Sequence, residues 1–244
     1  MLKALTTAEP ARFFRRMIEF GVGREFLPEI FRMKETPAGP EEHHPEGDLL
    51  THSLQVLERV CGSTGDVLTR FCALFHDLGK LETSPELYPK HHGHDEAGFR
   101  ASRPFCDRLA LPAAYRTALG WVNRLHTTAN RWEELRTGTK MKLAEQAVRG
   151  GIADILPLVT AADKPDRVEM SGWDCAMRIV RLSTAELGID PRLLASVPVD
   201  GVVPLPPDQR PALIHQKRVE MFRAVSERKS ESAGENRFDT GDGF

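Results

Sequence analysis

The stretch ALFHDLGK, residues 73–80, decides how the fold of this chain is interpreted. An apolar run ends in a histidine and an aspartate side by side, and a glycine and a lysine follow. One interpretation is a helix that reaches the surface and ends in a polar cap. The other is that His76 and Asp77 bind a metal ion while Lys80 binds an anion next to it. Other histidines and a distant aspartate decide between the two.

Around this stretch, apolar residues recur at helical spacing, and signals for β-strands are nearly absent. The segment 64–79 is the most apolar of the expected helices, so we expect it to be central and buried. Residues 8–20 carry a proline near the first turn and stop at Gly21. The other expected helices are 47–62, 112–126, 139–149, 153–163 with a kink or break at Pro157, 173–188 and 207–229. The sequence therefore predicts an all-α fold, a single compact body of roughly ten helices.

The composition is that of an ordinary globular protein. Of the 244 residues 41% are hydrophobic and 28% are charged, and the formal net charge is −2. This balance argues against a basic coat for nucleic acid, although a local basic face stays open. None of the four cysteines forms a C-x-x-C pair, so we expect reduced, buried thiols. No apolar run approaches the ~20 residues of a membrane helix, and no signal peptide is apparent, which predicts a cytoplasmic protein without a membrane partner.

Candidate metal ligands surround the HD pair in the sequence. His52 lies within the preceding expected helix, and a helical hairpin would set it beside His76, although a core histidine is the alternative. Asp163 ends an apolar helix, where a buried carboxylate needs a partner: a metal, a helix cap or an ion pair with Arg167. Two further histidines complete the set, His94 in a polar stretch and His126 at a helix end, where the helix dipole alone would favour it.

Imidazole and carboxylate ligands without a thiolate suit Mn, Ni, Co, Mg, Fe or Zn, in one or two ions. The predicted metal ligands are His52, His76, Asp77, Asp163, His94 and His126. Asp77 and Lys80 are the predicted catalytic residues, since a metal supplies hydroxide at neutral pH and a lysine neutralises a phosphate. Lys80 is also explained as a cation at a helix C-terminus. Lys80, Arg124, Arg167, His91 and His92 are the predicted substrate-binding residues.

The order H…HD…D resembles the signature of the HD superfamily of metal-dependent phosphohydrolases. The segments HHPEGDLLTHSLQVL, RFCALFHDLGKLETSPELYPKHHGHDEAG and VTAADKPDR are similar to the HD domain of bacterial tRNA nucleotidyltransferases, the multifunctional CCA-adding enzymes. The opening TTAEPARFFRRMIEFGVGREFLPEI is similar to the neck before that domain. The resemblance implies a neck-like segment 1–47, an HD core 48–196 and a helical extension 197–228, followed by a tail 229–244 that we expect to be disordered.

The resemblance implies metal ligation by His52, His76, Asp77 and Asp163, with His94 and His126 available for a second ion. The sequence of this chain departs from the pattern of the family in two ways. The nucleotidyltransferase head, with its Gly-Ser loop and paired aspartates, is absent from this sequence, so CCA addition is not expected here; a separate nucleotidyltransferase chain stays open as a partner. Where the family has Gly-Arg after its last aspartate, this chain has Asp166-Arg167.

The implied function is phosphoester hydrolysis: 2′,3′-cyclic phosphodiesterase, 2′-nucleotidase and phosphatase activity on nucleotides or RNA ends, within RNA processing. The main alternative is a module that binds tRNA or other RNA with little or no hydrolysis. A second alternative is a hydrolase of free nucleotides such as dNTPs or alarmones, whose family members lack the PELYPKHHGHDEAG block.

Overall fold

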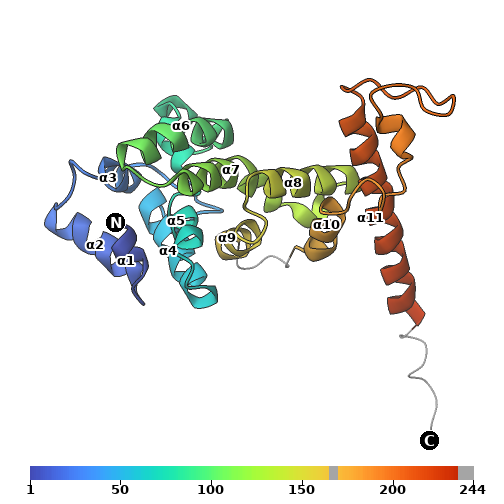
Figure 1. Ribbon diagram of the computed structural model, residues 1–244. Coiled ribbons are helices and arrows are strands. Elements are labelled where there is room, and N and C mark those ends of the chain that lie inside the picture. Colours follow the sequence, from blue (N-terminus) through green and yellow to red (C-terminus); the bar gives the residue numbers. More distant parts are fainter. Residues whose placement is uncertain (165–169, 236–244) are drawn as a thin grey trace, which may run out of the picture. The chain divides into compact units, whose positions relative to one another are not determined.

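The computed structural model describes residues 1–164 and 170–235, and its described residues form helices and loops without a strand (Figure 1). The all-α prediction is therefore confirmed. The only pairings of extended backbone in the described residues are two isolated bridges, Pro37 with Asp48 and Val199 with Val202. None of the described helices is both long enough and apolar enough to cross a bilayer.

The contacts divide the expected single body into two compact units. Unit 1 comprises the described residues of 1–131 and 149–169, and unit 2 those of 132–148 and from 170 onward. The helices of unit 1 are α1 (Leu2–Leu5), α2 (Pro10–Phe20), α3 (Pro28–Glu35), α4 (Leu49–Ser63), α5 (Val67–Leu74), α6 (His94–Arg108), α7 (Ala113–Ala129) and α9 (Leu156–Asp163). The helices of unit 2 are α8 (Thr137–Arg149), which ends at the unit boundary, α10 (Trp173–Val180) and α11 (Arg210–Glu235).

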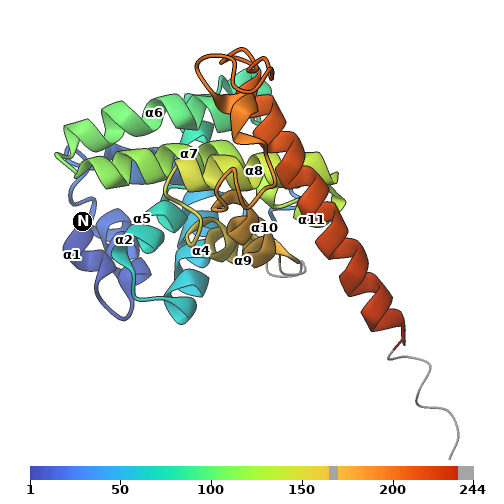
Figure 2. The same cartoon turned by 45° about the vertical axis from the view of Figure 1, so that its right-hand side comes forward.

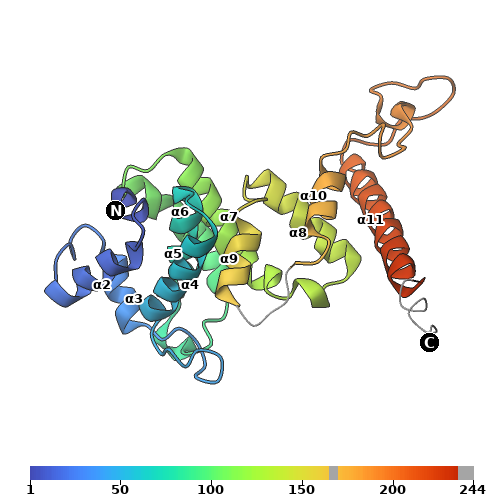
Figure 3. The same cartoon turned by 90° about the horizontal axis from the view of Figure 1, so that it is seen from below.

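Unit 1 is built around two helix pairs. The helices α4 and α5 pack against each other, and α9 contacts both (Figure 3). The helices α6 and α7 lie side by side and share the most extensive helix–helix contact of the unit (Figure 2). Buried Phe71 and Phe75 pack on Phe105 of α6, with ring centroids 6.2 and 4.8 Å away, which joins the two pairs through one aromatic core.

Several helix predictions need correction. Helix α6 was not predicted, because Pro104 interrupts its pattern; the ring removes one backbone donor, but the helix continues around it. The predicted helix 173–188 ends at Val180, because Ser183 and Glu186 form a capping box that starts a new turn. Helix α9 begins at Leu156, with Pro157 in its first turn, where the missing N–H has no helical partner to lose.

At the C-terminal end, helix α11 continues to Glu235, beyond the predicted helix end at residue 229. The remainder of the predicted tail, residues 236–244, lies outside the described residues. In unit 2, Trp132 and Trp173 pack edge to face with ring centroids 5.2 Å apart, and buried Phe222 joins α11 to this core.

Candidate metal centre

The sequence predicted that the HD pair ends a helix. In the structure the pair lies in a turn after the helix. Helix α5 ends at Leu74, and His76 and Asp77 precede a 3-10 helix over Leu78–Glu82. The Nδ1 atom of His76 donates to the carbonyl of Ala73 at 2.9 Å. The histidine thereby satisfies a carbonyl that the end of α5 leaves without a helical partner. The turn directs both side chains into the interior, where they are almost fully buried.

Buried Asn123 of α7 holds this turn in place. Its Nδ2 donates to the carbonyl of Phe75 at 3.0 Å, and its Oδ1 accepts from the backbone N–H of Gly79 at 3.4 Å. Gly79 also approaches the start of α6 so closely that a Cβ atom there would lie 1.9 Å from the carbonyl oxygen of His94. Only glycine fits at position 79. Asn123, which holds the turn, is a structural residue of the site that the sequence analysis missed.

Three side chains converge on one side of Asp77 and form a group of four with it. The Nε2 of His76 lies 3.3 Å from Oδ2 of Asp77, and the Nε2 of His52 lies 4.0 Å from the same oxygen. Both imidazoles also face Oδ1 of Asp163, at 3.0 Å from His52 and 3.8 Å from His76. These are the four side chains predicted to bind the first ion, and they come from α4, the HD turn and α9.

The other oxygen of Asp77 faces a second pair of histidines. Its Oδ1 lies 3.3 Å from Nε2 of His94 and 3.2 Å from Nε2 of His126. Each histidine comes from one member of the α6–α7 pair. The structure thus brings all six predicted ligands together, with Asp77 between two groups of imidazoles.

The Nδ1 atoms of the four histidines are all engaged away from the cluster. Each lies within hydrogen-bond distance of an oxygen: Glu46 Oε1 for His52 (2.7 Å) and the carbonyls of Ala73 for His76 (2.9 Å), His91 for His94 (3.0 Å) and Asn123 for His126 (3.0 Å). Since carbonyls and ionised carboxylates only accept hydrogen bonds, each Nδ1 carries a proton, and in a neutral ring Nε2 keeps a lone pair.

The converging atoms fit a cation. The Nε2 atoms of His52 and His76 and the Oδ1 of Asp77 are buried without a hydrogen-bond partner among the described residues. Lone pairs that face carboxylate oxygens at 3–4 Å repel one another unless a proton or a metal ion lies between them. Three overlapping groups of these residues have ligand atoms close enough for one ion: His52 with His76 and Asp77, His76 with His126 and Asp163, and Asp77 with His94 and His126.

The electrostatics of the cluster point the same way. Burial raises the pKa of Asp77, but the charges of Lys80 and His76 outweigh burial and hold the pKa well below its usual value. The pKa of Asp163 is also lowered, because close contact with the imidazole of His52 and the charge that His76 carries when protonated outweigh burial. Burial lowers the pKa of His126, but the hydrogen bond and charge of Asp77 raise it to about 9. Both aspartates therefore stay ionised, and the site attracts positive charge.

Lys80 is held against the cluster. Its Nζ lies 2.7 Å from Oδ2 of Asp77 and donates to the carbonyl of Ala38. The side chain is buried but still lines a cavity of about 170 Å³ that opens onto Asp77, His94, His126 and Asp163. Two lysines that the sequence analysis did not select, Lys90 and Lys164, also line this cavity.

Among the other predicted substrate residues, those that the structure describes do not line the cavity. His91 is buried, with Nδ1 at 2.7 Å from the hydroxyl of Thr83 and Nε2 at 2.8 Å from the carbonyl of Pro37. Both of its ring nitrogens are thus occupied, which favours a structural role.

His92 is exposed and does not line the cavity. Arg124 pairs with Glu96 at 3.1 Å and stacks over Phe99. Arg167 lies outside the described residues.

The cavity also contains residues for which no pattern had been recognised. Asn130, which directly follows α7, donates to Oδ2 of Asp163 at 2.5 Å, and His44 forms part of the wall. His44 and Glu46 belong to the segment HHPEGD, which stands directly before the helix of His52. Its cluster of histidine and acid was a usable signal, but the segment looked like an ordinary polar loop.

Comparisons with known proteins agree with the geometry. The family model for the HD domain matches residues 49–167. The multifunctional CCA protein of Methylococcus capsulatus is 42% identical over 144 residues, and that of Legionella pneumophila is 39% identical over 144 residues. The protein of the same name from Thioalkalivibrio sulfidiphilus is 38% identical over 145 residues. The predicted resemblance to the HD domain of these proteins is therefore confirmed.

The extent of the matches is limited in one respect. Each covers 59% of this chain but only 34 or 35% of the relative, so the chain spans about a third of the length of the curated relatives it matches. No solved structure shows a significant match to this chain.

Proposed function

We propose that the HD domain of this chain is a metal-dependent phosphohydrolase that acts on 2′,3′-cyclic nucleotides, 2′-nucleotides or the phosphorylated ends of RNA. The observation that carries the proposal is that the two carboxylate oxygens of Asp77 face two separate pairs of histidines. Such a carboxylate between imidazole groups suits one or two divalent ions of the Mn, Ni, Co, Mg, Fe or Zn type. His52, His76, Asp77 and Asp163 would hold the first ion, and Asp77, His94 and His126 the second.

The residues around the proposed ions have distinct roles. When bound, the metal would supply Lewis acidity and lower the pKa of a bound water to about 7. Asp77 orients the ligands on both sides, and Asn130 fixes Asp163 through its second oxygen. Lys80 places a positive charge beside Asp77 at the cavity wall, where it can stabilise negative charge that develops on a phosphoryl group.

The size and charge of the cavity favour a terminal or cyclic phosphate. Its volume of about 170 Å³ is below the roughly 300 Å³ at which pockets for whole small molecules begin. A phosphate therefore fits inside, while the nucleoside or RNA strand remains outside. Three lysines, Lys80, Lys90 and Lys164, line the space. They match the charge of a monophosphate or a diester better than that of a triphosphate, which calls for a denser basic pocket.

The test is a substrate panel with the purified protein. We expect turnover of 2′,3′-cyclic AMP and 2′-AMP with at least one of Mn²⁺, Ni²⁺, Co²⁺ and Mg²⁺, loss of turnover with a chelator, and recovery when the metal is returned. Turnover of dATP alone would move the protein to the nucleotide-hydrolase alternative. No turnover of any substrate by protein that contains metal would contradict the proposal.

A second candidate function, RNA binding, is favoured by a pocket within unit 2. This pocket of about 680 Å³ lies between the start of α8 and the side of α11. Its lining includes Arg136, Lys142, His215 and Arg223 but no carboxylate. Arg136, Lys142 and Arg223 are exposed. Of the three, only Arg223 has a carboxylate nearby in the described part of the chain, since its charge helps to lower the pKa of exposed Glu220. Such a group of cations suits the phosphates of an RNA such as tRNA.

A further inference from the structure

The segment just before the His52 helix is a closed loop. The bridge between Pro37 and Asp48 brings its two ends together, and the N–H of Ala38 donates to the carbonyl of Gly47 at 2.9 Å. Asp48 then caps α4 by accepting from the N–H of Thr51 at 2.9 Å. The side chains of this loop are thereby held in a fixed position next to the first turn of α4, which carries His52.

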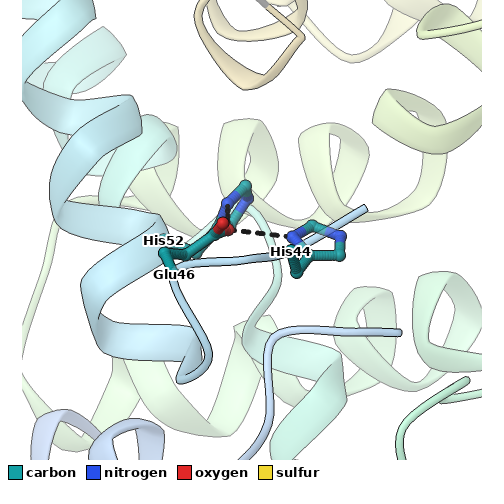
Figure 4. Close-up of side chains that lie close together, drawn as sticks. All are labelled: His44, Glu46 and His52. Atoms are coloured by element: carbon teal, nitrogen blue, oxygen red, sulfur yellow. Dashed lines mark hydrogen bonds and ion pairs between the residues drawn. The ribbon is translucent and has the colours of Figure 1, made fainter. Parts of the chain in front are cut away.

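Within this loop, Glu46 connects two histidines through a single oxygen (Figure 4). Its Oε1 lies 2.7 Å from Nδ1 of His52 and 2.9 Å from Nδ1 of His44. The two imidazoles meet edge to face, with centroids 4.8 Å apart and planes at 85°. The side chain of Glu46 is only 10% exposed, so this arrangement is shielded from water.

We propose that Glu46 is a positioning residue, whose carboxylate keeps the Nδ1–H tautomer of His52 so that Nε2 faces the metal centre and orients His44 at the cavity wall. The inference rests on the proposed metal site. An ionised carboxylate can only accept, so both rings must turn their Nδ1–H toward it. Without Glu46, the ring of His52 could rotate or change tautomer. The lone pair on its Nε2 would then no longer point to the metal site beside Asp77 and Asp163. Partners of this kind typically contribute a factor of 10–100 to metal affinity.

The experiment compares Glu46→Ala and Glu46→Gln with Glu42→Ala, an exposed glutamate of the same loop. Zn²⁺ affinity is measured by competition with a chelating dye. We expect it to fall about 10–100-fold in Glu46→Ala, less in Glu46→Gln, which keeps one acceptor oxygen, and less than twofold in Glu42→Ala. Helical circular dichroism and the melting temperature verify that each variant is folded.

A second measurement reports on the ring itself. In Zn²⁺-loaded wild type, NMR should show a slowly exchanging Nδ1–H proton of His52, assigned by its absence in His52→Gln. We expect this signal to exchange with water in Glu46→Ala and to persist in Glu42→Ala. A folded Glu46→Ala variant with unchanged Zn²⁺ affinity and an unchanged Nδ1–H signal would overturn the inference.

These readouts separate the inference from the proposed reaction. If wild type binds Zn²⁺ but hydrolyses no phosphoester, the proposed function fails, while a drop in affinity in Glu46→Ala still supports the positioning role. If wild type hydrolyses 2′,3′-cyclic AMP and Glu46→Ala matches it in Zn²⁺ affinity, the inference fails and the function stands. A wild-type protein that binds no metal would overturn both.

The part of the inference that concerns His44 has its own test. A Cβ atom on Gly39 would lie 2.3 Å from Cδ2 and 2.9 Å from Nε2 of His44, so Gly39→Ala must displace this ring. Because His44 is not among the proposed ligands of either ion, we expect Gly39→Ala and His44→Ala to raise KM severalfold while Zn²⁺ affinity stays within threefold. A KM unchanged in both variants would show that the position of His44 has no part in substrate binding.

Discussion

Unit 1 and unit 2 both gather charged side chains around a cavity, but they hold them in different ways. In unit 1 the cluster of Asp77 and Asp163 with four histidines is buried except for half-buried His94, and the Nδ1 atoms of the histidines are engaged by backbone or carboxylate oxygens. In unit 2 the cations Arg136, Lys142 and Arg223 are exposed, and only Arg223 has a carboxylate nearby in the described residues.

This difference shows what each region is suited to. Buried acceptors that face one another are costly unless a specific cation fills the gap, so unit 1 depends on geometry and tolerates little change. Exposed cations on long side chains cost little and adapt to many anions, so unit 2 depends on charge and is sensitive to salt. Substitutions should therefore act all-or-none in unit 1 and gradually in unit 2.

The largest effect should follow replacement of the shared aspartate. We expect Asp77→Asn to lower kcat/KM by at least about 10³-fold, the upper end for loss of one preorganised charged group, and to reduce bound metal. Steady-state kinetics and metal analysis measure both. The control is Asp154→Asn, an exposed aspartate of unit 1 that should retain wild-type turnover. If Asp77→Asn keeps full turnover, the proposed site is wrong.

Lysines at two depths of the cavity sharpen the comparison within unit 1. Lys80→Met should cost about 2–4 kcal/mol in kcat/KM while metal content is retained, because the substitution removes a cation that competes for Asp77. Replacing the more accessible Lys90 or Lys164 with Met should lower kcat/KM by only up to about 1 kcal/mol each, mainly through a higher KM. Equal effects of all three substitutions would contradict a special role for the buried lysine.

Two glycines test the close packing that supports the HD turn. Gly79→Ala places a Cβ against the backbone of α6, and overpacking of this kind costs about 1–3 kcal/mol or more in the free energy of unfolding. At Gly62, in the last turn of α4, a Cβ meets nothing within 4 Å, so Gly62→Ala should be neutral or stabilising by up to about 1 kcal/mol. Urea denaturation of the two variants measures the difference.

The smallest effects are expected in unit 2. Arg136→Gln and Arg223→Gln should each weaken tRNA binding modestly and lower the slope of log affinity against log salt by about 0.7–0.9. Fluorescence anisotropy at several salt concentrations measures this slope. Arg181→Gln, an exposed arginine of the same unit outside the pocket, is the matched control. Slopes equal to that of wild type in both pocket variants would exclude the pocket as an RNA site.

The sequence predicted the ligand residues better than their surroundings. Histidine and aspartate at the positions of His52, His76, Asp77 and Asp163 have few uses together in an apolar setting, so the combination of residue types favoured a metal site over the separate structural roles of each residue. His91 and Arg124 were selected by proximity in sequence, but their neighbours in space, Thr83 and Glu96, occupy them. Charge and spacing along the chain do not show which partner a side chain meets.

The sequence by itself determined the helical class and the set of candidate metal ligands, because helical periodicity and residue type are local properties that each segment carries alone. Only the tertiary structure decided that Asp77 divides its oxygens between two histidine pairs, that Asn123 secures the HD turn and that Glu46 supports His52. The reason is that these contacts join segments far apart in the chain, and a periodic pattern shows which face of a helix is buried but not which distant face covers it.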